Sequence, residues 1–552
     1  MININNFFFE RRNMKTQKKF IFVFLLLAFF GLAISSSVRV GPTYAIINCK
    51  IFPVSGPPVE NGVIVIRDGI IESLGPLEKI SIPEDAEVIK ADGMFAYPGL
   101  IDAHTNVFIE VKKEEPQRPT GIPMQIQGQE TKHHPELEVF NLLKPKKSTL
   151  ENLHKIGITT VLVVPEKGIY AGQSVLLNLN GEKAEPMLIK NSFALHINFS
   201  TARGAYPSSL MGTVALLKQS FLDTEYYSSY KSRFSRFSKG LKRPEYDPFL
   251  EALIPFVVEK KPVVFNCANL EDIKRALRVI KEFKLNGYLT GANEAWRVAS
   301  LLIKAKVPLL VSLDFKPPFT SLYANRGKEL KEKAEKEIYP ANASNLHEQG
   351  IKFALTSHGV KKTSDILKNI QKAIKAGLPK EEALKALTII PAQFLGVDDI
   401  LGSLEPGKIA NIILTSEEIF EEKAKVQRVF VDGFSFEIKQ PPKGVKKASL
   451  NIGGKWRATV SGPMGEMEMT VEIEQEGNQI SGTISSDFGQ WEISDGFLSE
   501  NNLTFTISAT IMGESMDMAF TGTAEKDSIE GTISFMDGSA ELKATKIPDA
   551  FH

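Results

Sequence analysis

The stretch that decides the fold is Tyr97-Pro98-Gly99-Leu100-Ile101-Asp102-Ala103-His104-Thr105-Asn106. An apolar run that ends in a polar, histidine-bearing tip is typical of a buried β-strand whose end opens at the mouth of a barrel. His104 is therefore a candidate metal ligand. Asn106 carries an amide, whose oxygen is a far poorer zinc ligand than an imidazole nitrogen.

Outward from this strand, short apolar runs alternate with helical patterns as far as about Val397, as a (β/α)8 TIM-like barrel requires. The clearest helix is predicted from Ser364, as its N-cap, to Ala376, with Gly377 at the stop position. Residues 110–147 and 205–244 are polar and irregular, which predicts loops over the barrel mouth or contacts between subunits. Six strands are predicted at Thr159–Val164, Phe193–Asn198, Pro262–Asn266, Gly287–Thr290, Val307–Leu313 and Phe353–Ser357.

Two β-rich segments flank this α/β region. The first, Tyr44–Lys90, contains the hairpin signal Asp68-Gly69, and the second contains the runs Ile409–Leu414 and Val429–Gly433. Segments of this kind at both ends of one region predict a single composite β-sandwich. Its parts are residues 38–97 and 398–440, and the barrel between them is residues 98–397.

The C-terminal region has a different composition. After a predicted linker at residues 441–447, residues 448–552 hold 17 Asp and Glu against 5 Lys and Arg, and seven of the thirteen Met. Met467, Met469 and Gly482 recur 49 positions later as Met516, Met518 and Gly531, which predicts duplicated hairpins in an all-β up-and-down barrel. Core packing explains the methionines, and a greasy ligand cavity or a soft Cu(I) site are the alternatives.

The N-terminus has the pattern of a secretory signal peptide at residues 14–37. Lys15, Lys18 and Lys19 precede the apolar run Phe20–Ile34, and small serines follow it. The alternative is an uncleaved anchor, but fifteen apolar residues fall short of the ~20 that a spanning helix needs. The start is either Met1 or Met14, and we expect an exported protein, periplasmic or secreted, whose contact with a membrane is limited to this targeting.

Charge and cysteine content indicate which partners and cross-links to expect. The whole chain carries +1, and no stripe of Lys and Arg is interleaved with aromatic residues, so we expect no nucleic-acid partner. The two cysteines of the mature chain, Cys49 and Cys267, lie in different predicted domains. They are expected to be buried apolar side chains rather than a disulfide.

From Tyr44 to about Ile438 the chain resembles the amidohydrolase superfamily. The strand that bears His104 is similar to that family's first strand, and Leu401–Asn411 is a close version of its signature. Gly157–Val161, Gly172–Ser174 and Tyr206–Gly212 resemble an imidazolonepropionase-like periplasmic branch. The opening Gly454-Lys455-Trp456 of the last region resembles lipocalin-type barrels. The first resemblance implies a metal-dependent hydrolase that acts on carbon–nitrogen bonds other than peptide bonds.

The same resemblance shows where this chain departs from the family. His104 stands at the first histidine, but Asn106 replaces the second. Asn266 and Gly291 stand where two further histidines are usual, and His358 stands where the family has an aspartate. One of these five family positions is unaltered, so the scaffold is easier to identify than the activity.

Three histidines still fall at predicted strand ends: His104, His196 and His358. They predict a reduced, mononuclear site for Zn²⁺ or another divalent metal, in which His358 serves as a ligand or as a general base. The alternative is that each imidazole satisfies a local hydrogen bond and no cofactor binds. The substrate pocket at the same mouth would be lined by Asn106, Asn198, Asn266, Asn293 and Arg203.

Two functions follow as hypotheses. The first is an exported hydrolase whose partner is a small-molecule substrate, cleaved at an amide, ureide, cyclic imide or modified amino acid. The second is a catalytically inactive protein of the amidohydrolase fold that binds a small molecule or a partner through the old pocket. Dimers are common in the family, so the resemblance also leaves a homodimer open.

Overall fold

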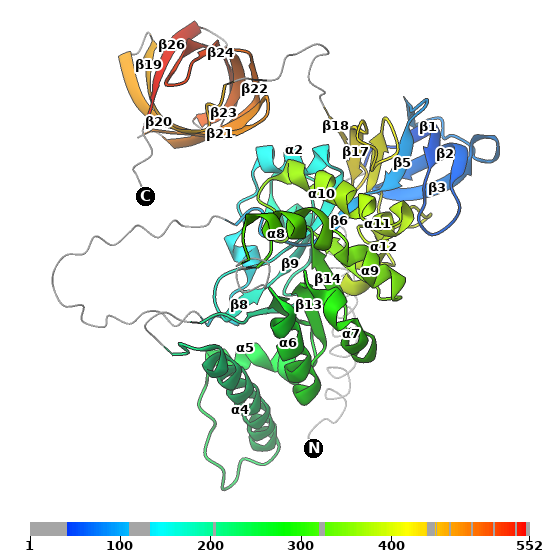
Figure 1. Cartoon of the computed structure of the whole chain (residues 1–552). Coiled ribbons are helices and arrows are strands. Elements are labelled where there is room, and N and C mark those ends of the chain that lie inside the picture. Colours follow the sequence, from blue (N-terminus) through cyan, green and yellow to red (C-terminus); the bar gives the residue numbers. More distant parts are fainter. Residues whose placement is uncertain are drawn as a thin grey trace, which may run out of the picture.

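The computed structural model describes residues 41–109, 133–201, 206–318, 326–438, 448, 450–462, 465–486, 489–511, 514–535 and 538–547. They form an α/β barrel, a β-sheet beside it and a closed β-barrel near the C-terminus (Figure 1). The predicted signal peptide and linker lie outside the described residues. Within the described residues, no helix has both the length and the apolar character that a membrane crossing requires.

The α/β barrel is built from parallel strands and one antiparallel run. The antiparallel run, formed by β8 (Tyr170–Gln173) and β9 (Val175–Asn178), closes the space between β7 and β11. Strands β6 and β7 are buried along their whole length, as strands covered on both faces must be. The parallel strands are β6 (Leu100–Thr105), β7 (Ile158–Val163), β11 (Leu195–Asn198), β12 (Val263–Cys267), β13 (Gly287–Gly291), β14 (Leu309–Ser312) and β15 (Ala354–Thr356).

Helices and short turns connect these strands and cover their outer face. The longer helices are α2 (Lys147–Lys155), α4 (Leu210–Arg236), α5 (Pro248–Val257), α6 (Leu270–Phe283), α7 (Ala299–Ala305), α9 (Asn342–Glu348), α10 (Thr363–Lys375) and α12 (Ile389–Leu395). The shorter elements are α3 (Ala184–Met187), β10 (Leu188–Lys190), α8 (Lys328–Lys333), α11 (Lys380–Lys385) and the single turns η1 (Leu77–Lys79), η2 (Val139–Leu142), η3 (Ala295–Val298) and η4 (Ala334–Ile338).

Strands from both ends of the barrel segment join in one sheet, as predicted. Its order is β18-β17-β16-β5-β1-β2-β3, with β4 also paired to β1. The two parts, which are distant in the sequence, meet where β5 pairs with β16, and an isolated antiparallel bridge also joins Ile70 to Ile409. The strands are β1 (Tyr44–Ile51), β2 (Val59–Arg67), β3 (Ile70–Pro76), β4 (Glu87–Lys90), β5 (Phe95–Pro98), β16 (Ile412–Thr415), β17 (Val426–Val431) and β18 (Phe434–Glu437).

A buried polar network fastens this sheet to the α/β barrel. Asn411, just before β16, donates through Nδ2 to Asn178 Oδ1 (3.0 Å) and Thr160 Oγ1 (3.2 Å), and its Oδ1 accepts from Asp432 N (2.9 Å). Asp432 in turn accepts from Asn178 Nδ2 (2.7 Å). Each buried polar group thus has a partner on the other subdomain, so the network fixes how the two pack.

The C-terminal region closes into an antiparallel barrel of eight strands among the described residues, with β19 paired to β26. Val471 pairs with Ile484, and 49 positions later Phe520 pairs with Ile533, so the sequence repeat reproduces a hairpin register. The strands are β19 (Gly454–Gly462), β20 (Gly465–Glu476), β21 (Gln479–Ser486), β22 (Gly489–Ser499), β23 (Asn502–Ile511), β24 (Glu514–Ala524), β25 (Ser528–Phe535) and β26 (Gly538–Lys546).

The repeated glycines have a steric cause. A Cβ on Gly482 would lie 2.0 Å from Glu472 O, and one on Gly531 would lie 2.5 Å from Thr521 O, so only a bare backbone fits at either position. Met469 and Met518 pack against the apolar core of this barrel, in agreement with their predicted packing role. Met464, Met512 and Met536 lie outside the described residues.

The structure corrects two predictions. Residues 205–244 were expected to be irregular, but most of them form the 27-residue helix α4. The buried face of this helix contains hydroxyl residues as well as apolar ones, namely Thr213, Leu217, Ser220, Phe221 and Thr224. These hydroxyl side chains interrupt the apolar periodicity by which the sequence would have predicted a helix.

The second correction concerns the helix predicted from Ser364, which begins one residue earlier. Lys362 is the N-cap of α10 and makes no side-chain cap. Gly377 ends this helix with φ of 109°, as expected of a residue at the stop position. Cys49 and Cys267 are buried and free, as predicted.

We expect Asn411→Ala to lower the free energy of unfolding of the α/β region by about 3 kcal/mol, because it removes the partners of two buried groups at once. Urea unfolding followed by circular dichroism measures this. Asn286→Ala, at an exposed asparagine of the same region, is the matched control and should change little. Equal midpoints for the two variants would contradict the role of the network.

Candidate functional site

Three histidines from distant strands meet at the carboxyl ends of the barrel strands. His104 lies on β6, His196 lies on β11 and His358 follows β15. The ring centroids of His104 and His358 are 4.2 Å apart, and those of His104 and His196 are 5.7 Å apart. The His104 ring therefore contacts both of the other rings.

Burial makes these imidazoles neutral. The pKa of His196 falls to about 3 and that of His358 to about 4, in both cases chiefly because the rings are removed from water. Burial, with the two neighbouring imidazoles, also lowers the pKa of His104 well below its ordinary value. A neutral imidazole keeps one nitrogen lone pair, so each ring is available as a metal ligand or proton acceptor at neutral pH.

Two of the ring nitrogens have no hydrogen-bond partner. These are His196 Nε2 and His358 Nδ1, and both are buried. In chemistry and burial they fit a divalent metal. In geometry the fit is incomplete, because no three His, Cys, Asp or Glu side chains among the described residues are arranged to hold one ion. The rings contact one another without directing three nitrogens at a common point.

His104 is positioned by two residues that the sequence did not single out. Asp102 Oδ1 accepts from His104 N (3.2 Å) and from Ser357 N (3.0 Å), the residue before His358. Thr290 Oγ1 lies 2.8 Å from His104 Nδ1, and the tautomer decides which of the two donates. Asp102 stands two positions before His104 on the same strand, which is the signal that could have pointed to it.

The buried Asp102 carboxyl is only partly satisfied. Its Oδ2 has no hydrogen-bond partner, and burial raises its pKa to about 6. It is the acidic side chain that joins β6 to the turn carrying His358.

The predicted pocket asparagines differ in their surroundings. Asn198 donates to the carbonyls of Glu166 (2.9 Å) and Gly168 (2.8 Å), so its amide holds a loop in place. Asn293 donates to Asp314 O (2.7 Å) and leaves a buried, unpaired Oδ1.

The other predicted pocket residues also differ in their exposure and their neighbours. Asn266 is half-buried on β12, and its Oδ1 lies 3.3 Å from where a Cβ on Gly291 would stand. Asn106 is exposed just beyond β6. Arg203 lies outside the described residues. Asn266 and Gly291 are therefore neighbours.

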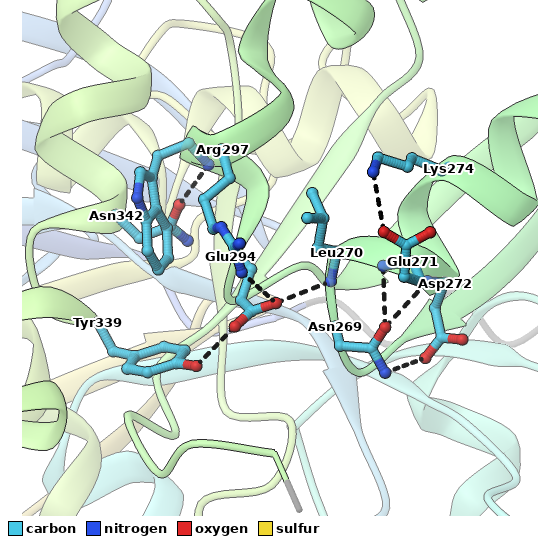
Figure 2. A network of polar contacts seen from close by, with 10 residues as sticks. Asn269, Leu270, Glu271, Asp272, Lys274, Glu294, Arg297, Tyr339 and Asn342 are labelled. Atoms are coloured by element: carbon cyan, nitrogen blue, oxygen red, sulfur yellow. Dashed lines mark hydrogen bonds and ion pairs between the residues drawn. The ribbon is translucent and has the colours of Figure 1, made fainter. Parts of the chain in front are cut away.

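A second polar cluster follows β13, where Figure 2 shows Glu294 at its centre. Glu294 is buried. Its Oε2 accepts from Leu270 N (2.9 Å) and its Oε1 accepts from Tyr339 Oη (3.0 Å), while Arg297 lies 3.4 Å from Oε2. Asn269 caps helix α6 beside it. These bonds tie the turn after β13 to the start of α6, so this carboxylate serves the fold.

We expect Glu294→Ala to lower the free energy of unfolding by about 3 kcal/mol, because it leaves the Leu270 amide and the Tyr339 hydroxyl without this acceptor. Urea unfolding is the measurement. Glu271→Ala, which removes an exposed ion pair with Lys274 at the same helix end, should cost less than about 1 kcal/mol. A loss no greater than that of the control would show that the buried cluster is dispensable.

Comparisons with known proteins agree with this architecture. The amidohydrolase family matches residues 268–435. Adenine deaminase 2 of Jannaschia sp. (strain CCS1) is 29% identical over 199 residues, covering 35% of this chain and 28% of that protein. Imidazolonepropionase of Bacillus mycoides is 27% identical over 124 residues, covering 19% of this chain and 27% of that protein. The chain thus matches less than a third of the length of these curated relatives.

Among solved structures, an amidohydrolase from Thermotoga maritima MSB8 has a TM-score of 0.59 and 24% identity, over 71% of this chain and all of that one. This likeness shows that the two share a fold. The family match includes His358 but neither His104 nor His196, so over residues 268–435 the chain is similar to amidohydrolases, and the solved structure adds the shared fold.

Proposed function

We propose that this protein is an exported hydrolase that cleaves a carbon–nitrogen bond other than a peptide bond in a small molecule. The observation that carries the proposal is the cluster of His104, His196 and His358 at the strand ends, with two buried nitrogens left unpaired. Buried polar atoms without partners are unfavourable unless something binds them. The relatives named adenine deaminase and imidazolonepropionase support a substrate of this kind.

In this proposal the three histidines form a reduced, mononuclear site for Zn²⁺ or another divalent ion. His104, His196 and His358 would hold such an ion, with the unpaired nitrogens His196 Nε2 and His358 Nδ1 among the donors. When bound, such an ion supplies a Lewis acid and lowers the pKa of a coordinated water.

The chain's own residues would do the positioning. Asp102 and Thr290 hold His104 through its backbone amide and its Nδ1. In its alternative role, His358 serves as a general base through Nδ1, which is buried and unpaired. The amides of Asn106, Asn266 and Asn293 offer neutral hydrogen-bonding groups to a neutral or zwitterionic substrate.

A second candidate function is a catalytically inactive binding protein of the same fold. The specific observation in its favour is that no three potential ligands in the described part of the chain are placed to share an ion. Asn106, Asn266 and Gly291 at family ligand positions point the same way. Such a mouth would still hold a small polar molecule by hydrogen bonds.

Metal analysis separates the two candidates. We expect residues 38–552, purified and dialysed against a metal-free buffer after incubation with zinc, to retain about one equivalent of metal by mass spectrometry. His104→Ala should lose the bound metal, because removing one of only three imidazole ligands would weaken the binding strongly.

His347→Ala is the control, since this half-exposed histidine lies outside the cluster and should leave the metal content unchanged. Circular dichroism would verify that both variants fold. A folded wild-type protein that retains no metal would overturn the hydrolase proposal and favour the binding protein.

A further inference from the structure

The carboxyl end of β14 carries a carboxylate that lies directly against the turn bearing His358. Asp314 stands two residues after the end of this strand. A Cβ on Gly359, the residue after His358, would lie 3.0 Å from Asp314 Oδ2, so the missing side chain there lets the carboxylate approach the turn. Ser312 Oγ donates to His358 O and accepts from Asp314 N (2.9 Å), which fixes the two residues beside each other.

The fold satisfies this carboxylate poorly. Asp314 is half-buried, and burial raises its pKa, as expected of a charge that has lost water. Its Oδ1 accepts one long hydrogen bond, from Lys316 N (3.4 Å). In the part of the chain that the structure describes, Oδ2 has no hydrogen-bond donor and the carboxylate forms no ion pair. The exposed Lys316 and Lys361 act on it by charge alone, and Glu335 opposes them.

A carboxylate that serves the fold has different surroundings. Glu294, near the end of the neighbouring strand β13, is buried, and both of its oxygens accept hydrogen bonds from the protein. A buried or half-buried charge normally has such partners. Asp314 lacks them, so its carboxylate is available to a ligand.

A second acceptor lies next to Asp314. Asn293 Nδ2 donates to Asp314 O (2.7 Å), and this bond leaves Asn293 Oδ1 buried and without a partner. The Ser312 hydroxyl is already used by His358 and Asp314. The groups left over on this side of the mouth are thus oxygen acceptors, which a ligand can satisfy only with N–H or O–H groups.

We propose that Asp314 and Asn293 bind an amidinium or guanidinium group of the substrate, beside the histidine cluster. Both groups are planar cations whose several N–H groups can reach a carboxylate and an amide oxygen at once, and the charge strengthens the bond to Asp314. A neutral amide would leave the half-buried charge of Asp314 uncompensated.

This inference rests on the proposed function, since it narrows the small-molecule substrate to one that carries such a cation. Binding of the cation itself does not require a metal on the histidines. The two proposals can therefore be tested separately.

Equilibrium binding tests the cation site. Benzamidine is the probe, and benzamide, which is neutral and of nearly the same shape, is the matched ligand. We expect the purified protein of residues 38–552 to bind benzamidine at least about 10-fold more tightly than benzamide in isothermal titration calorimetry, because a charged hydrogen bond replaces a neutral one. Asp314→Asn should remove this preference, since it deletes the charge and keeps the shape.

Two further variants complete the experiment. Asn293→Ala should weaken benzamidine binding roughly 5-fold, because it removes a neutral acceptor. Asp399→Asn, at an exposed aspartate before Ile400 and outside the mouth, is the matched control and should bind both ligands like the wild type. Circular dichroism would verify that each variant folds.

The outcomes separate this site from the hydrolase proposal. A wild-type protein that binds benzamidine no more tightly than benzamide, or a folded Asp314→Asn variant that keeps the preference, overturns the cation site. Zinc retention without a preference for benzamidine would refute the cation site alone. A preference for benzamidine that depends on Asp314, in a protein that retains no zinc, would support the cation site and overturn only the hydrolase proposal.

Discussion

The α/β barrel depends on closing the gap between its first and last parallel strands, which lie some 250 residues apart in the chain. Asp102 on β6 accepts from the backbone of Ser357, just after β15, and the backbone of Ile101 and Leu355 donates to Leu387 and Ala386. These bonds bring the ends of both strands to one place. Because a buried carboxylate is costly without partners, Asp102 favours the closed arrangement, in which its Oδ1 accepts two backbone hydrogen bonds.

The same closure creates the candidate site. His104 follows Asp102 by two positions and His358 follows Ser357 directly, so joining the two strands also joins the two imidazoles. His196 comes from the opposite side of the antiparallel β8–β9 run. The site is therefore a consequence of barrel geometry, and burial within it explains why all three imidazoles are neutral.

Several polar side chains at the carboxyl ends of the strands make hydrogen bonds that hold the fold. Asn198 and Asn293 hold loop carbonyls, and the buried Glu294 anchors the turn after β13 to helix α6. Hydrogen bonds of this kind are satisfied without a cation. Beside these satisfied groups, buried polar atoms of Asp102, His196, Asn293 and His358 have no hydrogen-bond partner.

The sequence by itself determined the architecture and the identity of the site's imidazoles. Period-two and apolar patterns are local, so β7, β12, β13 and the duplicated hairpins were predictable from the sequence. Helix α4 was missed because Thr and Ser on its buried face break the apolar periodicity. Only the tertiary structure decided which polar atoms find partners, since Asp102, Thr290 and Glu294 bond to residues that are distant in the chain. The direction of each imidazole nitrogen was decided in the same way, because it depends on packing from several strands at once and leaves no local trace in the sequence.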